Sequence, residues 1–188
     1  MRTPGTPAVD WLGRSVGVAE LGSLGNLMTT GTFITPIWDC GWLAGDDVEF
    51  PPTASDRELL ERYVSSPAFH TSFIPSDRDE TGIHGPFIAD RIVASDFVPL
   101  KESALEEYLA ALLYSSEWDS PASAEQFAAV LNQLRKPFAQ GMRCFFLRFD
   151  ESRSDLHHDW GFVLTVFREF LFLGRRPGVI ARFVIGYD

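Results

Sequence analysis

The last 47 residues carry the feature that most restricts the fold of this chain, namely three long apolar runs rich in aromatic and β-branched residues. The runs cover 142–150, 160–173 and 178–187. Between the second and third runs, the sequence GRRPG supplies Gly174, Pro177 and Gly178, which suit a hairpin loop of about five residues. Because each run is apolar at almost every position, both faces of these strands must be covered. The pattern predicts a C-terminal antiparallel β-meander at the centre of a sheet.

Short capping signatures predict helices before this meander. A capping box, in which a Ser is followed three residues later by a Glu, occurs at Ser55 and again at Ser103. Apolar residues recur at helical spacing behind each box, and a similar stripe follows Pro121. The expected helices span 56–64, 104–115 and 121–135, with Pro137 ending the last of them.

The chain is expected to form one α+β domain over 1–188, in which two or three helices pack against an antiparallel sheet. Residues 32–42 predict a further strand that Pro36 interrupts. Residues 1–31 are rich in Gly, Pro, Ser and Thr, and their glycine spacing matches no phosphate-binding motif. We therefore expect an irregular segment there.

Charge is distributed unevenly along the chain. Residues 1–134 hold 7 Lys and Arg against 20 Asp and Glu, a balance of −13, whereas residues 135–188 hold 9 against 6, a balance of +3. An acidic surface does not neutralise phosphates, so nucleic acid is not expected as a partner. Acidity favours encounter with a basic protein, although solubility alone would also explain it. The sequence leaves the oligomeric state open.

The chain shows no targeting or membrane-spanning signal. Its first residues lack the apolar core of a secretory signal, and no window reaches the ~18 apolar residues of a membrane helix. Cys40 and Cys144 stand far apart without a CxxC spacing. This spacing suits buried thiols in a reducing compartment and leaves a disulfide between them open. A cytoplasmic protein without membrane attachment is therefore expected.

Aromatic residues flanked by acids mark two candidate contact sites for a basic partner. One site lies in the loop between the second and third expected helices, and the other precedes the first helix. The candidate partner-binding residues of the two sites are Trp42, Asp46, Asp47, Glu49, Glu117, Trp118 and Asp119. Buried aromatic anchors of this kind dominate many protein interfaces. The alternative for each site is a Trp that packs inward while the acids face water.

The loop PSDRDETGIHG, residues 75–85, contains the first half of a calcium-binding pattern. Asp77 and Asp79 occupy the first ligand positions, but Ile88 stands where a bidentate Glu is required. Half a ligand set does not hold the ion, so no metal is predicted. Asp77, Asp79 and Glu80 are instead expected at the tip of an acidic contact loop.

Two adjacent histidines and an aspartate precede the second apolar run. Side chains alternate along an extended chain, so His157 and His158 do not readily share a metal ion. Asp159 could orient one imidazole, as in a hydrolytic relay, and Glu169 could then serve as general base. The competing interpretation is a polar turn before a strand, with Arg168 and Glu169 held in structural ion pairs. We favour the turn because no nucleophile stands nearby.

The ending WGFVLTVFREFLFLGRRPGVIARFVIGYD, residues 160–188, resembles the last third of small uncharacterised bacterial proteins found among cytoplasmic immunity-type proteins. The resemblance rests on hydrophobic rhythm together with Glu169 and Asp188, and it carries over no functional residue. It implies a protein that binds and blocks a toxin. Together with the acidic balance, it predicts an immunity-type inhibitor of a basic partner, without cofactor or metal. A small hydrolase and a scaffold subunit are the alternatives.

Overall fold

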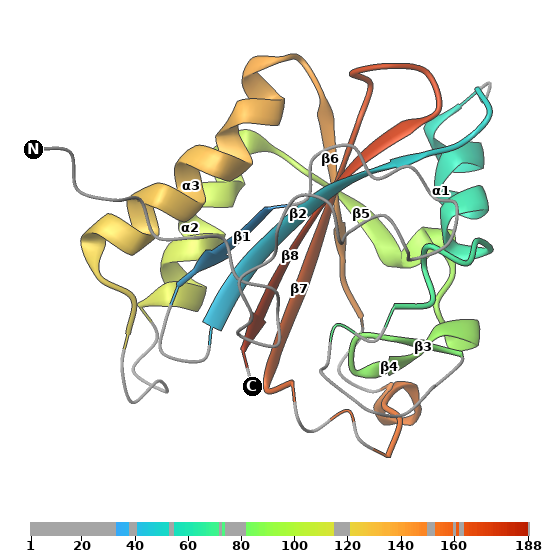
Figure 1. The fold of residues 1–188 in the computed structure, drawn as a ribbon, viewed down its shortest axis with the longest axis horizontal. Helices are drawn as coiled ribbons and strands as arrows, with labels where there is room; N and C mark the ends of the chain where they lie inside the picture. The colour runs from blue at the N-terminus through green and yellow to red at the C-terminus, as the bar shows by residue number, and fades with distance from the viewer. Residues whose placement is uncertain are drawn as a thin grey trace, which may run out of the picture.

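A six-stranded antiparallel sheet forms the centre of the molecule (Figure 1). The computed structural model describes residues 33–37, 41–52, 55–71, 73, 82–114, 121–149, 153–159, 161 and 164–187. Helices α2 (Glu102–Leu113) and α3 (Ala124–Ala139) cover one face of the sheet, hereafter the helical face. Helix α1 (Asp56–Val64) and the segment that follows it cover the other, hereafter the α1 face. This architecture is the expected α+β class.

The strands of the main sheet follow the order β1-β2-β8-β7-β6-β5, and every neighbouring pair is antiparallel. Their bounds are β1 Phe33–Pro36, β2 Gly41–Glu49, β5 Phe97–Leu100, β6 Arg143–Leu147, β7 Val166–Leu173 and β8 Val179–Tyr187. A separate pair joins β3 (Ile83–His84) to β4 (Phe87–Ile88). Short 3-10 helices span Ala89–Arg91, Ala94–Asp96 and Ser154–Leu156.

The C-terminal meander is confirmed, because β6, β7 and β8 are consecutive neighbours in the sheet. The GRRPG hairpin turns with Gly178 at φ 76°, a conformation that glycine adopts most readily. A Cβ at Gly178 would also collide with the carbonyl group of Phe50, whose N–H donates to Gly178 O over 2.7 Å. Strand β7 is shorter than predicted because its first residue, Val166, already pairs with Tyr187, the last residue of β8.

The strand expected over 32–42 is in fact two strands that form an antiparallel hairpin. Phe33 of β1 lies opposite Gly45 of β2, and Pro36 ends β1. Strand β2 then continues to Glu49, well beyond the predicted end, and pairs along its whole length with β8. The acidic stretch 46–49 is thus part of an interior strand rather than a loop.

The first helix matches its prediction, and its N-cap Ser55 accepts a hydrogen bond from the Glu58 N–H over 3.2 Å. The capping box predicted at Ser103 is wrong, because α2 already begins at Glu102 behind the N-cap Lys101. Glu106, the expected second half of that box, instead binds Arg135 of α3 over 2.6 Å. A tertiary ion pair therefore replaces the predicted local capping interaction of Glu106.

Helix α3 begins later and ends later than predicted. Its N-cap is Ser123, which forms a capping box with Gln126. Pro137 lies inside the helix, so the prediction that it ends the helix is wrong. Pro137 lies in the last turn of α3, so the helix tolerates the loss of its one backbone N–H donor. The helix ends at the C-cap Gln140, and the next residue, Gly141, adopts φ 75°.

Two apolar cores lie on opposite faces of the sheet. The core of the helical face includes Leu105, Leu109, Leu134, Phe170 and Phe172. The core of the α1 face includes Tyr63, Phe69, Phe167, Leu171 and Val184. Burial of each large apolar side chain contributes about 1.5–3 kcal/mol, so the two cores together supply most of the driving force for folding. Among the described helices, none is long and apolar enough to cross a membrane.

Candidate functional site

The buried polar side chains of the described residues gather in one place. His84, Glu169 and Arg182 are 0%, 0% and 7% exposed, and they are the only polar or charged residues among the buried ones that the structure describes. Side chains alternate along a strand, so Glu169 shares the α1 face with Phe167 and Leu171. A concentration of buried polar groups is the normal mark of a functional or a specifically structural site.

Both carboxylate oxygens of Glu169 are bound by neighbours from other elements. The hydroxyl group of Tyr63, on α1, donates to Oε1 over 2.5 Å. His84 Nε2, on β3, lies 2.8 Å from Oε2. The ring of Phe69 stacks on the His84 imidazole with 3.8 Å between centroids and seals it from solvent.

The second nitrogen of His84 determines where the protons are. Nδ1 lies 2.5 Å from the carbonyl oxygen of Phe69, and a carbonyl only accepts, so Nδ1 carries a hydrogen. One further proton is then shared between His84 Nε2 and the Glu169 carboxylate. Burial acts to raise the pKa of Glu169, but His84, Arg182 and Tyr63 outweigh it and the pKa is lowered. The pair is therefore an imidazolium–carboxylate ion pair with no net charge.

A second ion pair adjoins the first. Arg182 of β8 lies directly opposite Asp46 of β2 and binds it in a bidentate manner, with Nε–Oδ1 at 2.8 Å and Nη2–Oδ2 at 2.6 Å. The Nη1 group donates to the Ala68 carbonyl over 2.9 Å and lies 3.4 Å from the Tyr63 hydroxyl oxygen. The Phe73 ring covers the guanidinium, 5.1 Å from its centroid. All the donors that face inward thus have acceptors.

This network holds the α1 face together rather than exposing reactive groups. Tyr63, His84 and Glu169 are each fully buried, and none of them lines the surface hollows of about 580 and 300 Å³. Burial first, and then Glu169, raises the pKa of the Tyr63 hydroxyl. A Tyr–Glu–His relay is a familiar acid–base arrangement, but all three side chains of this one are buried among the described residues. Its effect is to tie α1 and the following segment to β2, β7 and β8.

The predicted histidine cluster is not part of the network. His157 is exposed and packs edge-on against Phe87, with 5.1 Å between ring centroids. His158 Nε2 lies 3.1 Å from the Gly85 carbonyl oxygen, and Asp159 is exposed. The histidine that meets Glu169 is His84 instead. Within the described part of the chain, no group of three or more His, Cys, Asp and Glu residues is placed to hold a metal ion.

The candidate partner-binding acids of β2 all face arginines of the same chain. Asp46 pairs with Arg182 and its side chain is only 13% exposed, so it is a buried ion-pair partner rather than a surface acid. Asp47 Oδ2 lies 3.6 Å from Arg175 Nη1, and Glu49 Oε1 lies 2.8 Å from Arg176 Nη2. Trp42 is half-buried and stacks on Phe73. Asp77, Asp79, Glu80, Glu117, Trp118, Asp119 and Cys40 lie outside the described residues.

Sequence reasoning missed Tyr63, His84 and Arg182. Arg182 did carry a signal, because it stands alone in the apolar run GVIARFVIGY, where a charge needs a partner. His84 and Tyr63 carried none, since one lies in a polar loop sequence and the other on the apolar stripe of a helix. Cys144 is buried, and burial raises the pKa of its thiol, which makes it an unreactive core residue.

No family model matches the sequence, and no significant match was found among curated proteins or solved structures. Functional assignment therefore depends on the surfaces and contacts of this chain alone.

Proposed function

We propose that this chain is an acidic protein-binding module of the bacterial cytoplasm, of the immunity type, which occludes a basic partner protein. The observation that carries the proposal is the exposed ring of Tyr114, which stacks on the half-buried Phe127 at the end of the α2–α3 hairpin. We define the α2–α3 tip as Tyr114, Glu125 and Phe127.

Tyr114 is 45% exposed, and Val93 is the only other large hydrophobic side chain that is exposed among the described residues. Its ring stacks on that of Phe127, with 4.9 Å between centroids and 28° between planes. Stacking holds the ring in place, so little conformational entropy is lost when a partner covers it. Rigid aromatic side chains of this kind are typical interface anchors.

Acidic residues adjoin this pair. Glu125 lies in the first turn of α3, is exposed, and has no ion-pair partner among the described residues. Glu117, Trp118 and Asp119 follow Tyr114 in the sequence, and the Ala122 N–H donates to Leu113 O over 3.0 Å. An aromatic centre with an acidic border fits a basic surface, and the chain has a net charge of −10.

The structure gives less support to the two alternative functions, a small hydrolase and a scaffold subunit. The hydrolase hypothesis needed Glu169 to act with His157, His158 or Asp159, whereas the carboxylate of Glu169 is bound by Tyr63 and His84. The scaffold hypothesis needs a broad apolar patch, and the exposed large hydrophobic residues of the described surface are Val93 and Tyr114 alone.

The test begins with capture of a binding protein from a bacterial lysate on the tagged full-length chain. The captured protein is then purified, and its affinity and association rate are measured at two salt concentrations. Tyr114→Ala should weaken the complex by about 2 kcal/mol, because the anchor is lost from the interface. Higher salt should slow association, because charge attraction speeds the encounter.

Val93→Ala is the matched control, since Val93 is 51% exposed and lies beside α1 rather than at the α2–α3 tip. It should leave the affinity unchanged. The proposal is wrong if both variants weaken the complex equally. It is also wrong if neither Tyr114→Ala nor higher salt changes the affinity. Turnover of a small molecule without any captured protein would favour the hydrolase instead.

A further inference from the structure

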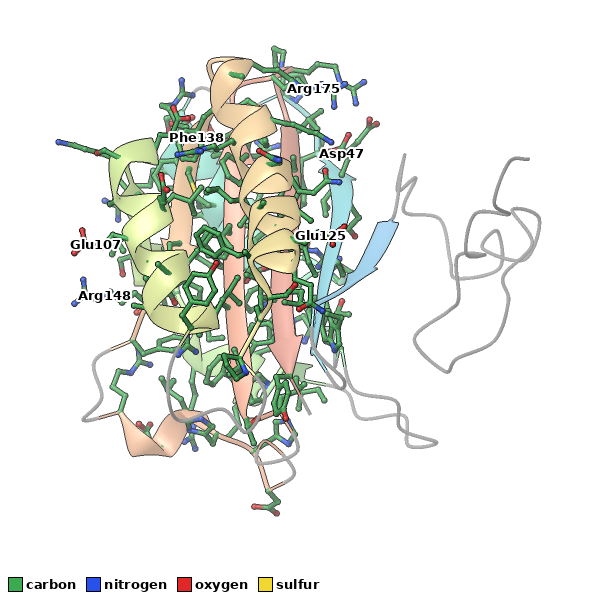
Figure 2. All side chains as sticks on the ribbon, turned by 90° about the vertical axis from the view of Figure 1, so that its left-hand side faces the viewer. Asp47, Glu107, Glu125, Phe138, Arg148 and Arg175 are labelled. Carbon is green, nitrogen blue, oxygen red and sulfur yellow. The ribbon has the colours of Figure 1, made fainter. Side chains whose placement is uncertain are left out.

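A pocket of about 300 Å³ opens on the helical face, where β2, the C-terminal half of α3 and the β7–β8 hairpin meet. Asp47, Lys136 and Arg175 contribute charged groups to its wall. Met142 and Phe183 contribute apolar surface. Figure 2 shows Asp47 and Arg175 close together at one end of α3. The network of the α1 face lies on the other side of the sheet, although its member Asp46 also borders the pocket.

Asp47 is a mostly buried carboxylate without a hydrogen bond. Its side chain is 14% exposed, and its nearest cation, Arg175 Nη1, lies 3.6 Å from Oδ2, beyond hydrogen-bond distance. No donor among the described residues reaches the carboxylate. Burial raises its pKa, against the lowering effect of Arg175 and Arg176. Buried carboxylates normally accept hydrogen bonds, whereas Asp47 has only the long ion pair with Arg175 among the described residues, so the pocket has room for a donor to it.

The adjacent residue makes the contrast plain. Asp46 points to the other face of β2, where both of its oxygens are bound by Arg182. The chain therefore satisfies one member of the Asp46–Asp47 pair completely and leaves its neighbour facing the pocket. Protein packing alone does not require a carboxylate at Asp47.

Cationic groups on the same wall define the other half of the site. The Arg175 side chain is 52% exposed, so its guanidinium can turn toward an incoming anion. Lys136 Nζ donates to Gln133 Oε1 over 2.8 Å and keeps further donors free for a ligand. The pocket thus offers one carboxylate that can bind a cation and two cationic side chains that can bind an anion. These groups lie beside an apolar surface.

We propose that this pocket binds a free α-amino acid with an apolar side chain. The ligand's ammonium group would donate to Asp47, its carboxylate would accept from Arg175 and Lys136, and its side chain would pack against Met142 and Phe183. A volume at the lower end of the range of ligand pockets, about 300–1,000 Å³, suits a molecule of this size. An amine alone would leave Arg175 and Lys136 without a ligand anion, and a carboxylic acid alone would bring no hydrogen-bond donor to Asp47.

The probes for the test are L-leucine and L-phenylalanine, added to the full-length chain and followed by thermal unfolding and titration calorimetry. At least one of them should raise the unfolding temperature. 3-Methylbutylamine and 4-methylpentanoate, which lack the carboxylate and the ammonium group of leucine, should each bind about tenfold more weakly, because each loses one charged hydrogen-bond contact.

Asp47→Asn keeps the shape of the side chain and removes its charge, so it should weaken amino-acid binding by about tenfold or more. Glu49→Gln is the matched control, because Glu49 is a β2 acid that pairs with an arginine but lies outside the pocket. It should leave binding unchanged. The proposal is overturned if neither amino acid binds, if Asp47→Asn binds as tightly as the native chain, or if the single-charge analogues match leucine.

Discussion

The two faces of the central sheet are stabilised in different ways, although the same strands β7 and β8 supply both. On the helical face, Phe170 and Phe172 pack with leucines of α2 and α3, and the core there consists of apolar residues. On the α1 face, the neighbouring positions Glu169 and Arg182 belong to a buried network of ion pairs and hydrogen bonds. The chain thus combines an apolar core on one face of the sheet with an apolar core that encloses a buried polar network on the other.

The difference teaches how the register of the strands is set. An apolar core accepts many arrangements of similar volume, because dispersion and hydrophobic burial have little directionality. A slip of β7 by one residue would turn Glu169 into the apolar core of the helical face, away from Tyr63 and His84. The polar network therefore penalises every register except the observed one, whereas the apolar contacts of both faces lack such directionality.

Removing the charge of Glu169 should have the largest effect. Glu169→Gln places an amide group where Tyr63 and His84 both donate, and it leaves the imidazolium without its counter-ion. Breaking a buried pair in this way costs about 3–5 kcal/mol of the free energy of unfolding, measured by urea denaturation. Phe170→Leu, one position along β7 on the helical face, should cost less than about 1.5 kcal/mol because the apolar core can repack.

Glu61→Gln is the surface control, since Glu61 is 54% exposed and pairs only with Arg57 on the same helix. It should change stability by less than about 0.5 kcal/mol. If Glu169→Gln costs no more than Phe170→Leu, the two faces do not differ as described.

A smaller effect is expected from acid. The pKa of Glu169 is lowered from 4.5 in the folded state, so its contribution is fully present above about pH 4.5 and is lost as pH falls through the folded pKa. The loss should be smaller than that from Glu169→Gln, because a protonated carboxyl group can still form hydrogen bonds with Tyr63 and His84. The difference in unfolding free energy between the native chain and Glu169→Gln should therefore shrink in acid. A difference independent of pH would contradict the ion-pair assignment.

Loss of a helix N-cap should have the smallest effect on the free energy of unfolding, and the effect should be equal on both faces of the sheet. Ser55→Ala removes the cap of α1, and Ser123→Ala removes the cap of α3, each of which accepts a backbone N–H over 3.2 Å. Both should cost about 1 kcal/mol in urea denaturation, because capping is local. Ser103→Ala is the control, since Ser103 lies inside α2 rather than at its cap, and it should cost less than about 0.5 kcal/mol. An equal cost at Ser103 would place the start of α2 where the sequence predicted it.

The local parts of the fold could be predicted because short-range rules govern them. The GRRPG loop and the apolar runs beside it predicted the meander, and Ser55 predicted the start of α1. The prediction at Ser103 was wrong because Glu106 binds Arg135 of a distant helix instead of capping α2. The prediction at Pro137 was wrong because a proline is tolerated so close to the end of α3. Strand β2 was not foreseen as an interior strand, because Asp46 and Asp47 interrupt its apolar pattern.

The sequence by itself determined the fold class, because alternation, helical spacing and turn residues act within a few positions of each other. Only the tertiary structure decided the candidate sites. Asp46 and Arg182 are 136 positions apart, and His84 and Glu169 are 85 apart. Whether an acid in this chain is bound by an arginine through two hydrogen bonds, like Asp46, or has only a long ion pair beside a pocket, like Asp47, depends on which face of β2 it occupies. That choice follows from the pairing of β2 with β8, a long-range contact that no local pattern encodes.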